Sequence, residues 1–210
     1  MQKVGKKLLI IGAGGHGRVV ADIANKMKVY SEIAFLDDDE TKTSVWRYLC
    51  EGTVERLKEE PKQTEVFVAI GNGVTRRNVQ NSIEKAGFRI PVLIHPCAVL
   101  GEDVKLDVGT VVMAGVVINS GVRIGKGVIV NTSSSVDHDC VIEDFVHIAV
   151  GTHVAGTVCI GENSWIGAGV IVSNNVNITR NTVIGAGAVV IQDIDESGTY
   201  VGVPAKRIGI

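Results

Sequence analysis

The sequence predicts a chain of two parts, an α/β domain of the Rossmann type followed by a β-solenoid. Three observations carry this prediction. Apolar runs alternate with helical patterns over residues 1–95, as in parallel sheets with helical crossovers. A glycine-rich turn, Gly12 to Gly17, separates the first apolar run from the first helical pattern. From Leu100 to Val190, every sixth residue is aliphatic.

The first part contains seven expected elements. In chain order they are a buried strand at residues 7–12, a helix at 18–28, a strand at 32–37, a short helix at 54–60, a strand at 65–70, a helix at 74–86 and an extended piece at 88–93. Strands that alternate with helices predict a parallel sheet. We place this domain at residues 1–95 and the solenoid domain at residues 96–210.

The glycine-rich turn reads Gly-Ala-Gly-Gly-His-Gly and precedes the first predicted helix. Glycines at such a place let backbone amides approach an anion at a helix N-terminus, as in pyrophosphate binding. Gly14, Gly15 and His16 are therefore candidate substrate-binding residues. Taken alone the motif is weak, and an ordinary tight turn or an NAD site remain open as alternatives.

Polar residues follow the second and third predicted strands at the same edge of the sheet. Asp37 and Asp38 follow the second strand, where a ribose or base edge binds in such folds, and Asn72 follows the third. His16 adds a donor between the last two glycines. Together these residues favour a nucleotide-sugar over NAD. For Asp39 a solvated loop is the serious alternative.

The strict period of six fits neither a helix nor a flat strand, so the chain must turn a corner every six residues. Three sides of six residues make a coil of 18, and the sixteen aliphatic positions make a little over five coils. Small or β-branched residues stand two places earlier, as at Thr110 and Cys140. Glycines that follow the aliphatic residue, such as Gly101 and Gly125, mark corners that need positive φ or close backbone approach.

Composition excludes several classes of protein. The net charge of −2 argues against a nucleic-acid partner, which needs a basic surface. No apolar run approaches the roughly 20 residues of a membrane span. The four cysteines show no C-x-x-C spacing, and Cys140 and Cys159 fall on or beside inward rows, which favours buried reduced thiols. We expect a cytoplasmic protein.

The whole chain resembles the bacterial nucleotide-sugar N-acetyltransferases of the hexapeptide-repeat type. The resemblance rests on GAGGHG, FLDD, AIGN, the tandem hexapeptides and the closing VGVPAK. These enzymes act on UDP- or GDP-linked 4-amino-4,6-dideoxy sugars, and their family includes the sialic acid O-acetyltransferases. The resemblance implies a left-handed β-helix, acetyl-CoA as co-substrate without a metal, an N-terminal domain that binds the nucleotide-sugar, and a homotrimer with active sites between subunits.

His138 is the candidate catalytic residue because carboxylates flank it in the sequence. A neighbouring carboxylate orients an imidazole and raises its basicity. Formation of an amide from an amine and a thioester needs a base that removes a proton from nitrogen. The resemblance implies that His138 is this base and Asp139 its partner, although other members have glutamate at that position.

His147 follows His138 by nine residues, half a coil, so the two lie on opposite sides of one prism. Opposite sides of neighbouring subunits can face each other, and we expect His147 to help hold acetyl-CoA in such a cleft. His153 is also outward, and a solvated role suits it better. The resemblance implies further contacts to acetyl-CoA or the sugar from Gly156, Ala168, Ala186, Asn131 and Lys206, with Arg207 also available to phosphates. Ordinary turn roles remain open for the glycine and alanines.

The expected mechanism is direct transfer, in which the sugar amine attacks the acetyl carbonyl, backbone amides stabilise the oxyanion and CoA thiolate leaves. An acyl-enzyme at Cys140 is disfavoured because that residue lies on the small inward row. Two rival functions remain. One is acetylation of a hydroxyl of sialic acid or a related sugar, and the other is a non-catalytic trimeric scaffold or nucleotide sensor.

Overall fold

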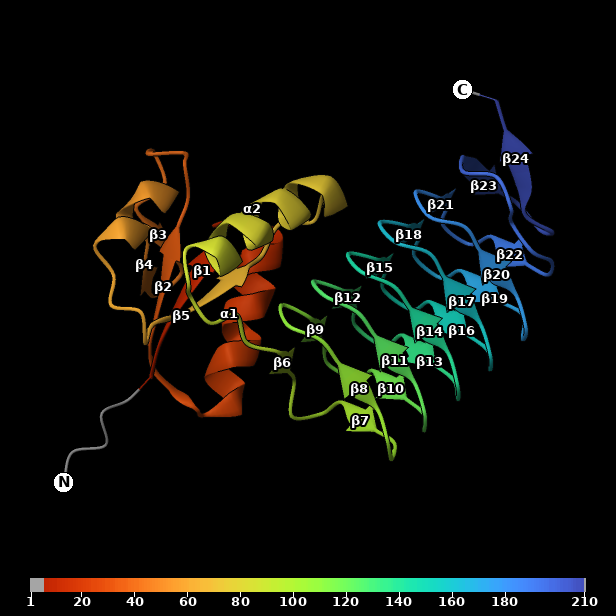
Figure 1. Cartoon of the computed structure of the whole chain (residues 1–210), viewed down its shortest axis with the longest axis horizontal. Helices are drawn as coiled ribbons and strands as arrows, with labels where there is room; N and C mark the ends of the chain where they lie inside the picture. The colour runs from red at the N-terminus through yellow and green to blue at the C-terminus, as the bar shows by residue number, and fades with distance from the viewer. Residues whose placement is uncertain (1–5, 210) are drawn as a thin grey trace. The chain divides into compact units, whose positions relative to one another are not determined.

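A computed structural model describes residues 6–209, which form two compact units that meet in the sequence at Pro96 and Cys97. The first unit comprises, in chain order, β1 (Lys6–Ile11), α1 (Gly15–Met27), β2 (Tyr30–Leu36), β3 (Ser44–Val45), β4 (Tyr48–Leu49), the 3-10 helix η1 (Val54–Lys58), β5 (Glu65–Val68), α2 (Gly73–Lys85) and β6 (Leu93–Ile94) (Figure 1). The predicted strands and long helices are confirmed. The β3–β4 hairpin has no counterpart in the prediction.

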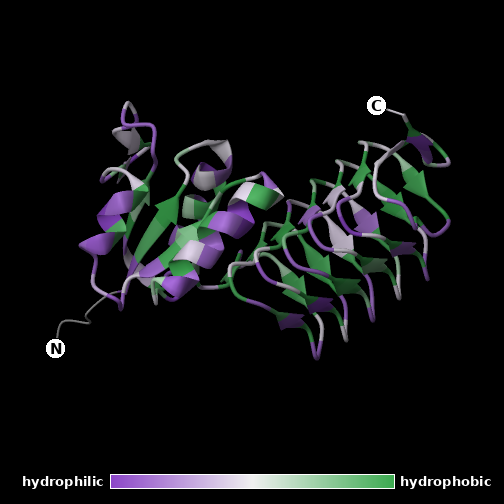
Figure 2. Ribbon diagram, turned by 45° about the horizontal axis from the view of Figure 1, so that its top comes forward, coloured by the Kyte–Doolittle hydropathy of each residue, from purple (hydrophilic) through white to green (hydrophobic). Residues whose placement is uncertain are grey.

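The sheet of the first unit is parallel and has the strand order β2-β1-β5. Leu9 of β1 and Val66 of β5 belong to a core that includes Ile83 of α2 and Leu57 of η1. On α1, Gly17 lies against the ring of Phe35, so α1 packs on the side of the sheet away from that core. Figure 2 shows these strands as mainly hydrophobic between helices of mixed character.

The second unit is built from two-residue strands joined by corners. They are β7 (Val99–Leu100), β8 (Lys105–Leu106), β9 (Val111–Val112), β10 (Val117–Ile118), β11 (Arg123–Ile124), β12 (Ile129–Val130), β13 (Ser135–Val136), β14 (Val141–Ile142), β15 (His147–Ile148), β16 (His153–Val154), β17 (Cys159–Ile160), β18 (Trp165–Ile166), β19 (Ile171–Val172), β20 (Asn177–Ile178), β21 (Val183–Ile184) and β22 (Val189–Val190). A hairpin of β23 (Thr199–Val201) and β24 (Lys206–Ile208) closes the chain.

The strands stack in three parallel columns, which confirms the predicted three-sided solenoid (Figure 1). We name each column after its first solenoid strand. The β7 face has the order β22-β19-β16-β13-β10-β7, and the β8 face has the order β20-β17-β14-β11-β8. The β9 face includes β21-β18-β15-β12-β9. Pairing is in register, with Val117 opposite Ser135. The second residue of every strand from β7 to β22 is one of the predicted aliphatic positions, and most are fully buried, as are Ile118 and Ile148.

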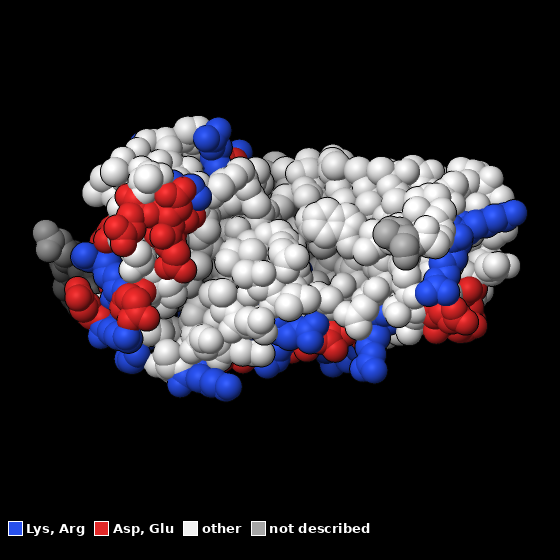
Figure 3. Space-filling view, turned by 90° about the horizontal axis from the view of Figure 1, so that it is seen from above, with Lys and Arg blue, Asp and Glu red and all other residues white. Residues whose placement is uncertain are grey.

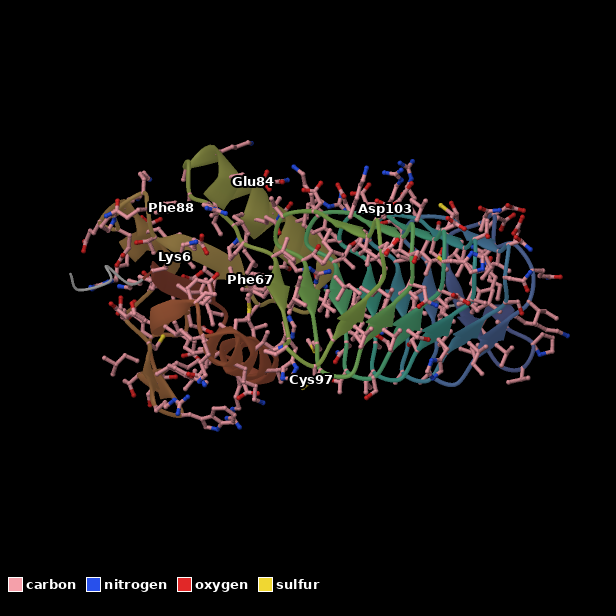
Figure 4. All side chains as sticks on the ribbon, turned by 90° about the horizontal axis from the view of Figure 1, so that it is seen from below. Lys6, Phe67, Glu84, Phe88, Cys97 and Asp103 are labelled. Carbon is pink, nitrogen blue, oxygen red and sulfur yellow. The ribbon has the colours of Figure 1, made fainter. Side chains whose placement is uncertain are left out.

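The corners show which of the two expected roles the glycines have. Positive φ recurs at every sixth residue from Asp103, labelled in Figure 4, to Gly187. Gly101 and Gly125 are not in this series. They are glycines because the next coil approaches their Cα atoms too closely to leave room for a Cβ. A Cβ on Gly101 would lie 2.6 Å from the backbone nitrogen of Ser120 in the next coil, and one on Gly125 would meet Asp144.

The four cysteines are free thiols. Cys140 is fully buried as predicted, but Cys159 is only half-buried because it is the first, outward residue of β17. Among residues 6–209, no helix is both long enough and apolar enough to cross a membrane.

Candidate functional site

His138 lies at the corner between β13 and β14, with its ring largely exposed. Its Nδ1 lies 2.9 Å from Oδ2 of Asp139, and its backbone N–H donates to Oδ1 of Asp137 at 2.8 Å. The amide of Asn119, one coil earlier, donates to the same Asp137 oxygen at 2.6 Å. Two carboxylates therefore hold this residue, one through its ring and one through its backbone.

The electrostatics favour proton uptake by His138. Its hydrogen bond to Asp139 and the nearby charge of Asp137 raise its pKa above the ordinary value of 6.5. The pKa of Asp137 is lowered by the amide of Asn119 and the N–H of His138. Because Nδ1 faces Asp139, Nε2 is the ring nitrogen left to meet a substrate.

The local backbone explains why an aspartate suits position 139. Asp139 has φ of 58° and belongs to the series of left-handed corners, and its N–H donates to the carbonyl of Ser120 at 3.1 Å. Aspartate tolerates this conformation better than longer side chains do, because its short carboxylate can bond locally. The same corner geometry thus brings Oδ2 to the imidazole.

Gly156 lies directly beside the His138 ring, one coil later. A Cβ on Gly156 would stand 2.6 Å from Nε2 and 2.7 Å from Cε1 of His138. A side chain at position 156 would therefore have to displace the His138 ring. The glycine predicted to contact acetyl-CoA therefore also gives the imidazole its place.

Cys140 adjoins this corner but faces inward. Its Sγ donates to the carbonyl of Ala155 at 3.1 Å and accepts from the N–H of Val158 at 3.4 Å. Burial raises the pKa of the thiol, which disfavours the thiolate needed for nucleophilic attack. The geometry supports a structural thiol.

His147 lies on the β9 face, whereas His138 lies at the corner opposite that face. Nδ2 of Asn131 is 3.3 Å from Nε2 of His147, and the ring of Trp165 lies 4.2 Å from the imidazole, centroid to centroid. The hexapeptide pattern places His147 at an outward position of its strand, but its side chain is buried in the structure. His153, on the β7 face, is exposed and pairs with Oγ of Ser135 at 2.8 Å.

Ala168 and Ala186 occupy equivalent places in successive coils, at the corner between the β9 and β7 faces. Both are exposed, and the carbonyl of Ala168 accepts from the N–H of Gly187 at 2.8 Å. Lys206 is exposed on β24. Arg207 departs from the expectation that it is available to phosphates, because it donates to Oε2 of Glu196 at 2.8 Å and to the carbonyl of Ser197.

One chain therefore gathers the predicted residues of the solenoid, apart from Lys206, into three separate groups. The group at His138 includes Asp139 and Gly156, the group on the β9 face joins His147 to Asn131, and the two alanines form the third. The first residues of the β9-face strands are uncharged; Val111, Ile129 and His147 are buried, whereas Trp165 and Val183 are exposed. Figure 3 looks onto this side of the solenoid and shows it almost free of charged side chains.

In the first unit, the glycine-rich turn leaves the start of α1 open. Gly14, the N-cap residue, has no side chain with which to cap the helix, and a Cβ on Gly14 or Gly15 would meet nothing within 4 Å. Gly17 has the opposite role, because a Cβ there would collide with the carbonyl of Gly12. No side chain at Gly14 or Gly15 therefore covers the start of the helix, where N–H groups without helical partners bind anions.

His16 is held neutral beside this turn. Burial and the nearby charge of Arg76 lower its pKa from 6.5 to about 4, and its buried Nε2 has no hydrogen-bond partner. Arg76 is 1% exposed, and its Nη1 donates to the carbonyls of Ile70 at 2.9 Å and Gly71 at 2.7 Å. Sequence reasoning missed this arginine, since a helical pattern does not distinguish it from its neighbour Arg77.

The polar residues at the sheet edge already have local partners. Asp37 accepts from the N–H of Ala13 at 2.7 Å and from Nζ of Lys42 at 2.9 Å, and these bonds outweigh its burial and lower its pKa. Asp38 accepts from the N–H of Val54 at 3.0 Å. Asn72 caps α2 through the N–H of Thr75 at 2.9 Å.

These bonds order the loops around the glycine-rich turn, since Asp37 bridges the ends of β1 and β2 while Asn72 ends the loop after β5. In the part of the chain from Lys6 to Gly209, no group of three or more His, Cys, Asp or Glu side chains is placed to hold a metal ion.

Comparison with known proteins agrees with both units. Residues 7–83 match the family described as the PglD N-terminal domain. The chain is 31% identical over 163 residues to the GDP-perosamine N-acetyltransferase of Escherichia coli O157:H7, covering 75% of this chain and 74% of that protein.

Solved structures are similar over nearly the whole chain. The acetyltransferase domain of PglB from Neisseria gonorrhoeae, in complex with acetyl coenzyme A, is 41% identical with a TM-score of 0.94 and covers 97% of this chain and 100% of its own. PerB from Caulobacter crescentus, in complex with CoA and GDP-perosamine, is 36% identical with a TM-score of 0.92 and covers 98% of each chain. These likenesses confirm the predicted left-handed β-helix preceded by an α/β part.

Proposed function

The chain belongs to the bacterial nucleotide-sugar N-acetyltransferases of the hexapeptide-repeat type, and on that premise we propose that it acetylates the 4-amino group of a UDP- or GDP-linked 4-amino-4,6-dideoxy sugar. Acetyl-CoA supplies the acetyl group. The observation that carries the proposal is the group at His138, where an exposed imidazole of raised pKa is fixed by Asp139 and bordered by Gly156.

The nucleotide-sugar binds at the first unit, with its diphosphate at the open N-terminus of α1. The open space beside Gly14 and Gly15 supports this placement. An anion there accepts hydrogen bonds from backbone N–H groups and is stabilised by the positive end of the helix dipole. His16 is neutral, so its unpartnered Nε2 serves as a hydrogen-bonding group and not as a charge. Asp37, Asp38 and Asn72 order the loops around the ligand.

His138 is the general base of the transfer. The sugar amine attacks the acetyl carbonyl, Nε2 of His138 takes the proton that the nitrogen loses, and the CoA thiolate departs. Asp139 keeps Nδ1 protonated and stabilises the imidazolium that forms. Backbone N–H groups stabilise the oxyanion, and the bare edge of Gly156 leaves Nε2 accessible.

The active enzyme is a homotrimer whose sites lie between subunits. His138 and His147 are half a coil apart, so within one chain they lie on opposite sides of the prism. This separation supports a site that combines His138 of one subunit with His147 of its neighbour. A neighbouring subunit brings its uncharged β9 face, with His147 and Asn131, toward the His138 corner. Ala168, Ala186 and Lys206 then border acetyl-CoA. A monomer at assay concentration that retains full activity would contradict this arrangement.

The test is a CoA-release assay with acetyl-CoA and a panel of UDP- and GDP-linked 4-amino-4,6-dideoxy sugars, with free sialic acid as the competing acceptor. Release with one nucleotide amino sugar, with the acetamide product identified by mass spectrometry, supports the proposal and names the nucleotide. Release with sialic acid alone would replace it with O-acetylation. No turnover with any acceptor would favour a scaffold that binds nucleotides.

A further inference from the structure

Trp46 stands at the tip of the β3–β4 hairpin, which the sequence did not predict. Val45 and Tyr48 pair across the hairpin, so Trp46 and Arg47 form its two-residue turn. The Trp46 side chain is mostly exposed, with 60% of the residue's surface accessible. Single exposed apolar side chains are common on protein surfaces, so exposure alone assigns Trp46 no role.

The backbone at Trp46 is also unusual. Its φ is 53°, in the left-handed region, whereas Arg47 has no positive φ. Tight hairpin turns place glycine, asparagine or aspartate at such positions. A bulky residue there is strained, and strain of this kind concentrates at functional sites.

The hairpin does not need Trp46 for its own stability. Val45 is buried, and the ring of Tyr48 packs against that of Phe35 at 6.2 Å between centroids. The indole instead contacts α1, because the guanidinium of Arg18 lies over its ring at 5.3 Å from the centroid. The N–H of Arg18 in turn donates to the carbonyl of Gly14. The exposed ring is thus fixed beside the first turn of the helix that presents the glycine-rich turn.

A nucleoside diphosphate bound there would extend in a defined direction. Its diphosphate lies at the N-terminus of α1, and in sheets of this type the ribose lies at the end of the second strand, here near Asp37. β2 is the outer strand of the β2-β1-β5 order, and the segment after the hairpin pairs along it, with Cys50 bridged to Phe35 and the N–H of Asp37 donating to the carbonyl of Gly52. A base that extends beyond the end of β2 therefore meets the loop and hairpin that connect β2 to this segment. We propose that Trp46 is the platform on which the nucleobase stacks, which rests on the proposed binding of a nucleotide-sugar.

The glycine variant separates this role from a structural one. Trp46→Gly suits the left-handed backbone, so the melting temperature should equal or exceed that of the native protein. Loss of a stacking platform should raise KM for the nucleotide-sugar by about tenfold, with KM for acetyl-CoA unchanged. Trp46→Phe, with a smaller ring, should give an intermediate KM. Leu49→Ala, an exposed change in the same hairpin, is the matched control and should leave both KM values unchanged.

Fluorescence gives a direct readout, because Trp46 and Trp165 are the two tryptophans of the chain. In Trp165→Phe, titration with UDP or GDP should quench the fluorescence of Trp46 saturably, whereas in Trp46→Phe the same titration should leave the fluorescence of Trp165 unchanged. Unchanged KM in Trp46→Gly, or no quenching by either nucleotide, would overturn the inference while native turnover leaves the proposed function intact. Absence of native turnover on every nucleotide-sugar would instead be a failure of the proposed function.

Discussion

In the solenoid each structural role recurs every six residues, whereas in the α/β unit each role is held by one residue. The left-handed corner appears from Asp103 to Gly187 at every sixth position, and the inward aliphatic residue recurs with the same spacing. By contrast, one buried residue, Arg76, donates from α2 to the carbonyls of Ile70 and Gly71. Repetition leaves the outward positions of the solenoid free to vary, so a departure from the repeat there points to function.

The two regions should therefore respond differently to substitution. A change at an outward corner of the solenoid disturbs its own coil and the two that touch it, because each coil contacts only its neighbours. A change at a unique buried contact of the α/β unit affects the whole cooperative unit. Four substitutions examine this contrast.

The largest effect is expected from His138→Ala. Loss of a general base lowers kcat by about 10²- to 10⁴-fold, while the exposed corner should leave the melting temperature unchanged. Steady-state kinetics and a thermal melt on the same preparation measure both quantities. Added imidazole should restore part of the rate, because the vacated site is open to solvent. A normal rate would remove His138 from catalysis, and a large loss of stability would contradict the local response of the solenoid.

Arg76→Met should give the largest loss of stability. It leaves the carbonyls of Ile70 and Gly71 without a buried donor, which costs about 2–4 kcal/mol of unfolding free energy. Because each unit carries one tryptophan, urea unfolding can be followed by Trp46 in a Trp165→Phe background and by Trp165 in a Trp46→Phe background. The first transition should shift to lower urea and the second should not.

The matched control for Arg76→Met is Lys85→Met, an exposed position on the same helix. Neither transition should move in this variant. Equal shifts of both transitions in Arg76→Met would show that the two units unfold together, and the contrast between them would fail.

The sequence was most informative where residues repeat. The period of six located every strand from β7 to β22, because each inward position had to be aliphatic. The period could not show whether Gly101 is needed for a positive φ or for close backbone contact, since the answer depends on the position of Ser120 in the next coil. The predicted 18-residue coil places Gly156 one coil after His138, but it could not reveal that the imidazole lies against Gly156 with no room for a Cβ, because that depends on the orientation of the His138 side chain.

In the α/β unit, the prediction reached the strands and helices but missed the residues that order the site. Apolar alternation located β1, β2 and β5, and glycine spacing located the turn. Nothing in a helical pattern marks Arg76 as buried, because charged residues are usually exposed on helices. The β3–β4 hairpin was missed since its turn carries Trp46 and Arg47 in place of the glycine or asparagine that signals such turns.

Gly156→Ala examines whether a repeat position can act through another residue. The added methyl must displace the His138 ring, which we expect to lower kcat by about tenfold, since a misplacement of about 1 Å can cost up to 10²-fold. KM for the nucleotide-sugar should change little. In a His138→Ala background the same substitution should have no further effect on the residual rate. An equal loss in both backgrounds would mean that Gly156 acts on acetyl-CoA alone.

Asp137→Asn should have the smallest effect and changes only charge. Asparagine still accepts the backbone N–H of His138, but the negative charge that raises the pKa of His138 is gone, so that pKa falls toward 6.5. The neutral imidazole is the active form, and activity declines as pH falls through this pKa. The acid limb of the profile of kcat/KM against pH should therefore move to lower pH in the variant, with a slightly lower plateau. Asp103→Asn, at an equivalent type of corner in the first coil, should leave the profile unchanged, and an unmoved acid limb in Asp137→Asn would assign the raised pKa to Asp139 alone.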